Sequence, residues 1–91
     1  MKLINPNHVK DAAFEIETID RNTIIYRENS KEVLLEREAG YDPEHYTAVY
    51  LSIVNKWNIP KDQEIETSKK DQIAENLKKG FDFMGERLKI E

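Results

Sequence analysis

Between Phe14 and Glu38, apolar and polar residues alternate in three successive runs, and this pattern constrains the fold more than any other feature of the sequence. The runs are AFEIETI, TIIYRE and KEVLLERE. A period of two is typical of strands that are buried on one face. The links at 20–22 and 29–30 consist of Asp, Arg, Asn and Ser, and three of these four residue types favour tight turns. The region therefore predicts three antiparallel strands joined as a meander.

The most apolar stretch of the chain, residues 46–60, reads YTAVYLSIVNKWNIP. Its β-branched and aromatic residues favour a strand, and both of its faces are apolar, which is typical of a strand in the middle of a sheet. Stacking on single-stranded nucleic acid would need exposed rings with basic residues between them, and Lys56 is the only base in this stretch. We therefore expect a core strand. Trp57 would dock at the end of the sheet, or else serve as an anchor for a protein partner.

A helix is predicted from Ser68 to Met84, because apolar residues recur there at helical spacing. They are Ile73, Leu77, Phe81 and Met84. Ser68 would cap the first turn, and Gly85 would end the helix. Gly80 falls on the apolar side, where it would let a strand come close. The last segment, RLKIE, would form a final strand.

These elements predict a single α+β domain over residues 1–91, with an antiparallel sheet of about five strands and one amphipathic helix on one face. The predicted order is strand, strand, strand, strand, helix, strand. The N-terminal segment NPNHVKDA could form a short helix, with Asn5 as its cap and Pro6 at its first position.

The sequence offers little catalytic chemistry. It has no cysteine, and its three glycines are isolated, so a disulfide, a thiolate nucleophile and a glycine-rich phosphate loop are excluded. Asp42, Glu44 and His45 lie close together and are residue types that could hold a metal or act as an acid–base pair. Such clusters are also common in acidic loops. We therefore expect no enzyme activity, no catalytic residue, no metal and no cofactor.

The location of the protein is predicted from its apolar segments. The N-terminus has no apolar run of the length that a signal sequence needs, and no stretch approaches the roughly 20 apolar residues of a membrane span. We therefore expect a cytoplasmic protein.

Negative charge is concentrated in the first half of the chain. Residues 11–44 contain ten acidic and four basic residues, whereas the whole chain has a net charge of −4. Such a surface repels phosphate backbones and anionic lipid heads, which argues against nucleic acid and membrane partners. It fits a protein partner with a basic surface, although acidic side chains also serve solubility alone.

The predicted partner-binding site lies where the acidic residues are densest. Four carboxylates fall within nine residues that contain one base, Arg37, and a neighbouring tyrosine could act as an aromatic anchor. The predicted site residues are Glu36, Glu38, Tyr41, Asp42 and Glu44.

From Phe14 to Glu91, and most clearly from Tyr46 onward, the chain resembles a family of small immunity proteins from bacterial polymorphic-toxin systems. The resemblance is carried by YTAVYLSIVNKWNIP, by the helix SKKDQIAENLKKGFDFMG and by the strand RLKIE. Trp57, Pro60 and two helix residues, Ile73 and Leu77, match the family pattern. These residues form the fold and carry over no active site. The N-terminal NPNHVKDAA departs from the pattern.

The resemblance implies an immunity-type protein that neutralises a cognate toxin by direct contact. If the toxin were a nuclease, carboxylates of this chain would take the place of its substrate phosphates. The alternative is a small housekeeping or phage-encoded protein-interaction domain, also without enzyme activity. Such a domain could form a homodimer through a sheet edge.

Overall fold

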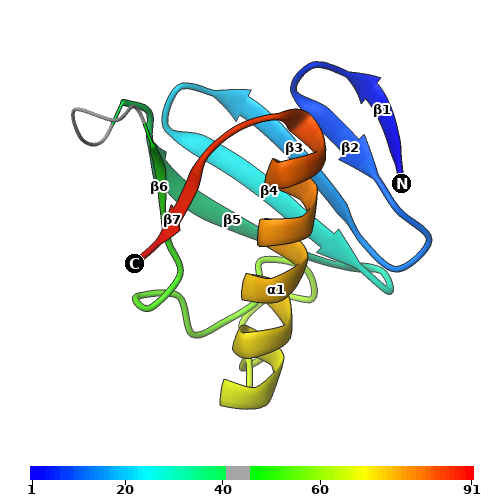
Figure 1. The fold of residues 1–91 in the computed structure, drawn as a ribbon. Helices are drawn as coiled ribbons and strands as arrows, with labels where there is room; N and C mark the ends of the chain where they lie inside the picture. Colours follow the sequence, from blue (N-terminus) through cyan, green and yellow to red (C-terminus); the bar gives the residue numbers. More distant parts are fainter. Residues whose placement is uncertain (41–45) are drawn as a thin grey trace.

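A computed structural model describes residues 1–40 and 46–91, and shows a curled sheet with one helix against one face (Figure 1). The strands are β1 (Lys2–Asn5), β2 (His8–Lys10), β3 (Glu15–Asp20), β4 (Thr23–Glu28), β5 (Lys31–Glu38), β6 (Thr47–Tyr50) and β7 (Leu88–Ile90). The helix α1 (Thr67–Met84) lies between β6 and β7 in the chain. Within the described residues, no helix has the length and apolar composition that crossing a bilayer requires.

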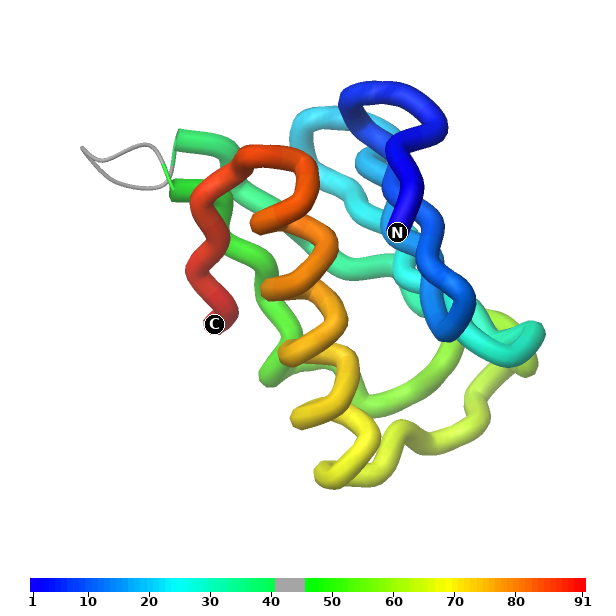
Figure 2. The backbone as a smooth tube through the Cα atoms, turned by 45° about the vertical axis from the view of Figure 1, so that its right-hand side comes forward, coloured from blue at the N-terminus to red at the C-terminus, as the bar shows by residue number. Residues whose placement is uncertain are grey.

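The spatial order of the seven strands is the same as their order in the sequence. Each pair from β1 to β6 is antiparallel, whereas β6 and β7 are parallel. A parallel pair needs a crossover connection, which α1 and the loop before it provide. Figure 2 shows the C-terminal segment returning beside β6 after the helix.

Tight turns set the register of the meander. Asn29 and Ser30 connect β4 to β5 with φ angles of 47° and 64°, as a two-residue hairpin turn of the primed type requires. Between β3 and β4, the backbone N–H of Asn22 donates to Oδ1 of Asp20 at 2.8 Å. The three predicted strands of this region and both turns are confirmed.

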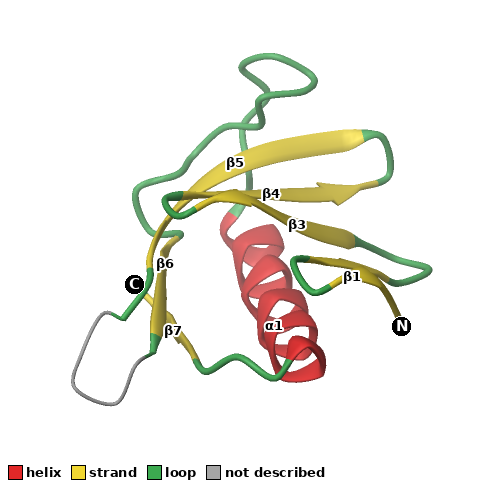
Figure 3. Ribbon diagram, turned by 90° about the horizontal axis from the view of Figure 1, so that it is seen from above, coloured by secondary structure: helices red, strands yellow, loops and turns green. Residues whose placement is uncertain are grey.

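The helix packs on what we call the inner face of the sheet (Figure 3). The core between the two layers consists of Val9, Phe14, Ile16, Ile24, Tyr26, Val33, Leu35, Val49, Leu51, Trp57, Ile65, Ile73, Leu77 and Phe81. Trp57 is 3% exposed and so belongs to this core. At Gly80 the helix approaches the sheet so closely that a Cβ atom would overlap Cδ1 of Ile16 and lie 3.3 Å from Cγ1 of Val9.

Within the described residues, three parts of the predicted fold class are wrong. The sheet has seven strands rather than about five, and it is mixed rather than antiparallel because β7 joins β6 in parallel. The N-terminal segment forms the hairpin β1–β2 instead of a short helix. The side chain of Asn5 explains this difference, since its Oδ1 accepts the backbone N–H of Asn7 at 2.8 Å and so stabilises a turn.

The core strand predicted in the apolar stretch 46–60 is shorter than expected, because β6 ends at Tyr50. The backbone N–H groups of Leu51 and Ser52 both donate to the carbonyl of Glu91, so the chain turns toward β7 at this point. The following loop pairs with itself, with the N–H of Trp57 donating to the carbonyl of Gln63 at 2.7 Å. Trp57 and Ile65 of this loop therefore pack in the core from outside any strand.

The helix ends as predicted but begins differently. Gly85 adopts a left-handed φ of 77° at the C-cap, and its N–H donates to the carbonyl of Asp82. Ser68 is not the N-cap, because the helix begins at Thr67 and Glu66 occupies the cap position without a side-chain bond.

Replacing Gly80 with alanine tests the close approach of the helix to the sheet. Alanine raises helix propensity by about 1 kcal/mol, but the added methyl overpacks the core, which costs about 1–3 kcal/mol. We therefore expect Gly80→Ala to lower the free energy of unfolding in a urea melt. Ile16→Val removes the Cδ1 atom that the methyl would meet. The double variant should consequently lose less free energy of unfolding than the sum of the losses of the two single variants.

The exposed neighbour Lys79 supplies the control, since Lys79→Ala changes helix propensity without touching the sheet. Its effect should stay within about 0.5 kcal/mol. Additive effects of Gly80→Ala and Ile16→Val would contradict the contact between these two positions.

Candidate functional site

The outer face of the sheet, which the helix does not cover, carries most of the charge of the meander. Cross-strand pairing places Lys10 opposite Glu15, Glu15 opposite Arg27, and Arg27 opposite Glu32. Charge sign thus alternates across four neighbouring strands. Opposite charges at directly paired positions stabilise a sheet, so this row helps to hold the strands in register.

Arg27 is the centre of this row and contacts three carboxylates. Its Nε donates to Oε1 of Glu32 at 2.7 Å, its Nη1 donates to Oε1 of Glu17 at 3.1 Å, and Nη1 lies 3.5 Å from Oε2 of Glu15. The imidazole Nε2 of His8 also contacts Oε2 of Glu15. Partial burial lowers the pKa of Arg27. Its hydrogen bonds to Glu32 and Glu17 and the charges of Glu15 and Glu32 raise this pKa by more than burial lowers it. The net pKa lies above its ordinary value, and the guanidinium stays charged.

The predicted site residues Glu36 and Glu38 also lie on the outer face, at the other end of β5. Both are exposed, whereas Val33 and Leu35 point into the core. The hydroxyl of Tyr50 donates to Oε2 of Glu38 at 2.7 Å, and Glu36 pairs with Tyr50 across the strands. The structure therefore places these two carboxylates on one exposed face.

The other predicted site residues lie outside the described residues. These are Tyr41, Asp42 and Glu44, and His45 of the considered metal cluster lies there too. Within residues 1–40 and 46–91, no group of three or more His, Cys, Asp and Glu side chains is arranged to hold a metal ion.

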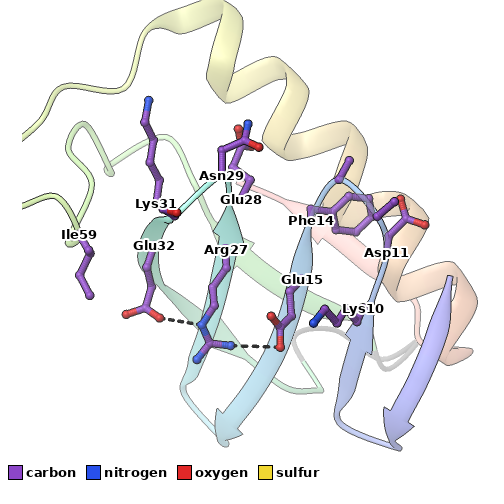
Figure 4. Close-up of a pocket in the computed structure, with 13 residues that line it drawn as sticks. Lys10, Asp11, Phe14, Glu15, Arg27, Glu28, Asn29, Lys31, Glu32 and Ile59 are labelled. Atoms are coloured by element: carbon purple, nitrogen blue, oxygen red, sulfur yellow. Dashed lines mark hydrogen bonds and ion pairs between the residues drawn. The ribbon is translucent and has the colours of Figure 1, made fainter.

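A pocket of about 400 Å³ opens where the strands β3 and β4 separate (Figure 4). Its lining comes from the loop between β2 and β3, from the turn between β4 and β5, from the strand ends that flank them, and from Ile59 in the later loop. The lining residues are Lys10, Asp11, Ala12, Ala13, Phe14, Glu15, Arg27, Glu28, Asn29, Ser30, Lys31, Glu32 and Ile59. We call this cavity the notch. It joins the outer-face charge row to an apolar wall.

A buried polar network fixes the hairpin that forms one side of the notch. Glu28 is 7% exposed, and its two oxygens accept from the Tyr26 hydroxyl at 2.6 Å and from Lys69 Nζ at 2.7 Å. Asn76 Nδ2 donates to the Tyr26 hydroxyl at 2.8 Å. Burial, and then the bond to Glu28, raise the pKa of Tyr26 well above its ordinary value, so this hydroxyl remains a donor. The helix and the β4–β5 hairpin are thereby tied together.

The loop after β6 covers part of β5 on the side that β6 leaves open. The N–H of Glu32 donates to the carbonyl of Ile59 at 2.8 Å, and Oδ1 of Asn58 accepts the N–H of Leu34 at 2.8 Å. Lys31 lies over the ring of Trp57, with Nζ 5.6 Å from its centroid. Ile59 is thereby held at the rim of the notch.

Sequence reasoning did not single out Arg27 or the notch. One signal could have found Arg27, because a two-residue turn at Asn29–Ser30 fixes the pairing of Arg27 with Glu32. No local sequence signal marks the notch. Its lining residues come from two separate connections and from a loop that lies about 30 residues later in the chain. The arrangement offers ionic and hydrogen-bonding contacts to a binding partner.

Replacing Lys69 with methionine tests the buried network. The carboxylate of Glu28 would then stay buried with one donor fewer, and a charged group left in this way costs about 1–3 kcal/mol or more. We expect a urea melt of Lys69→Met to show that loss, and Glu28→Gln in the same chain to recover part of it. Lys79→Met is the matched control on the exposed side of the helix. Equal melts for the two methionine variants would contradict a stabilising role for the ion pair.

The comparisons with known proteins give no relative for this chain. No protein-family model matches the sequence, and neither a curated protein nor a solved structure matches it.

Proposed function

We propose that this chain is a non-enzymatic, immunity-type binding protein that acts in the cytoplasm and neutralises a bacterial toxin by direct contact. The partner is a protein with a basic surface, and the outer face of the sheet is the docking surface. The observation that carries the proposal is the acidic outer face, which lies on the side of the sheet away from the helix and on which Glu36 and Glu38 are exposed.

The charge balance of that face supports a basic partner. On the outer side of β3, β4 and β5, the described residues include five glutamates and one guanidinium, that of Arg27. The glutamates are Glu15, Glu17, Glu32, Glu36 and Glu38. Complementary charge steers diffusional encounter and suppresses wrong partners. A protein with a basic cleft would therefore associate with this face faster than a neutral protein.

Apolar side chains lie among these charges. Leu34 and Ile19 are 44% and 51% exposed, whereas Ile25, which pairs with Leu34, is only 9% exposed. Interfaces commonly combine an apolar centre with a polar rim. A typical interface takes about 800 Å² from each partner, which is about one seventh of the 5707 Å² surface of the described chain. One face of the sheet is large enough for such a contact.

The test of the immunity function is protection of a poisoned cell. The chain is co-expressed with the toxin reading frame found next to its gene, and survival is compared with an empty vector. We expect survival to be restored, and we expect the two purified proteins to form a stable complex. Cell death at the same rate with and without the chain would overturn the immunity function.

Charge reversal then tests the docking surface. Glu36→Lys together with Glu38→Lys should slow association with the toxin by about tenfold or more at low salt, because the steering field is removed. The far-UV circular dichroism should not change. Glu75→Lys together with Asp82→Lys makes the same change in net charge on the exposed side of the helix and is the matched control. If both double variants associate equally fast, the partner does not dock on the outer face.

A further inference from the structure

The notch is an open cavity at the end of the β3–β4 ladder. Glu15 and Arg27 are the last paired residues of β3 and β4, and beyond them the chain separates into the 11–14 loop and the Asn29–Ser30 turn. The resulting cavity of about 400 Å³ lies in the usual size range of ligand sites, about 300–1,000 Å³. Figure 4 shows the labelled side chains at its edges, with Phe14 on one side and Glu32 on the other.

One part of the lining is apolar and accessible. Ala12 and Ala13 are exposed, Ile59 is 53% exposed, and Phe14 lies behind them in the core. Long basic side chains bury their methylene stems along such surfaces and keep the charged head in a polar environment. The apolar wall of the notch suits a stem of this kind.

The other part of the lining has a surplus of negative charge. The lining contains four acidic side chains, Asp11, Glu15, Glu28 and Glu32, and three basic ones, Lys10, Arg27 and Lys31, so its formal net charge is −1. The ammonium of Lys31 is engaged over the Trp57 ring. The notch therefore attracts a cation.

Two acceptors remain for the head group of that cation. Arg27 uses Oε1 of Glu32 and lies nearest Oε2 of Glu15, while Oε2 of Glu32 and Oε1 of Glu15 accept no hydrogen bond from the described residues. A planar guanidinium can bridge carboxylate oxygens with several N–H groups, whereas an ammonium acts as a point charge. Arginine is also enriched among the residues that dominate binding energies.

We propose that the notch binds an arginine side chain of the protein partner, with its stem against Ala13 and Ile59 and its guanidinium on the carboxylates of Glu15 and Glu32. That the arginine comes from a toxin rests on the proposed function. That the notch selects a guanidinium on an apolar stem rests on the notch alone, and can be measured without a partner.

The test is a titration of the isotopically labelled chain with N-acetyl-arginine amide, followed by two-dimensional amide NMR. The matched control is N-acetyl-citrulline amide, which has the same shape without the charge. We expect arginine to shift the amide signals of Ala13, Asn29 and Glu32, with a Kd in about the millimolar range for a probe of this size. Citrulline should bind at least about tenfold more weakly, because it offers no charge to the carboxylates.

A variant that fills the notch completes the test. Ala13→Trp should abolish the arginine-dependent shifts, while Ala39→Trp, at the exposed turn position that follows β5, should leave them unchanged. Equal shifts with citrulline, shifts away from the notch, or undiminished binding to Ala13→Trp would overturn the proposal. Arginine binding without protection of toxin-treated cells would support the notch as an arginine site and reject the toxin as partner. Protection without arginine binding would support the toxin as partner and reject the notch as an arginine site.

Discussion

The close contact between Gly80 and the side chains of Val9 and Ile16 is the constraint on which the two-layer structure depends. A residue with a side chain at this place would push the helix away from β2 and β3. Glycine costs about 1 kcal/mol of helix propensity, and here that cost is offset by the dense packing that its missing Cβ permits. Ile73, Leu77 and Phe81 can then reach the core from the same helix face.

Because one helix covers the inner face, the two sides of the sheet have different physical roles. The inner side is mostly apolar, and around its buried Glu28 both carboxylate oxygens are matched by donors, one from the helix and one from Tyr26. The outer side faces water, and there antiparallel pairing sets carboxylates beside a single guanidinium on β4. Register, which the buried residues impose, therefore also determines the charge pattern that a partner would meet.

The local elements of the fold could be predicted from the sequence because each carries its own signal. The alternation after Phe14, the Asn29–Ser30 turn and the Gly85 stop are local features, and the structure contains all three. The N-terminal hairpin was missed because Asn5 and Pro6 suit a helix start as well as a turn. The length of β6 was missed because the chain turns after Tyr50 and Leu51 and Trp57 are buried from a loop, a tertiary effect that has no periodicity.

The candidate site was predictable only where it follows one strand. Alternation along β5 was enough to place Glu36 and Glu38 on one exposed face. The triple contact of Arg27 depends on the pairing of three strands, and the notch depends on where two of them part. Such features depend on how segments distant in the sequence are placed in space, so the pattern of neighbouring residues along the chain does not predict them.

The order of the strands has a consequence for how the chain assembles. From β1 to β6 every strand pairs with its neighbour in sequence, so each step closes a short loop and loses little chain entropy. The β6–β7 pair instead joins segments separated by the whole helix and its preceding loop. Topologies rich in local contacts fold faster than those that depend on distant ones. We therefore expect the meander to form early and the C-terminal strand to dock last, with the helix seating against a sheet that is already in register.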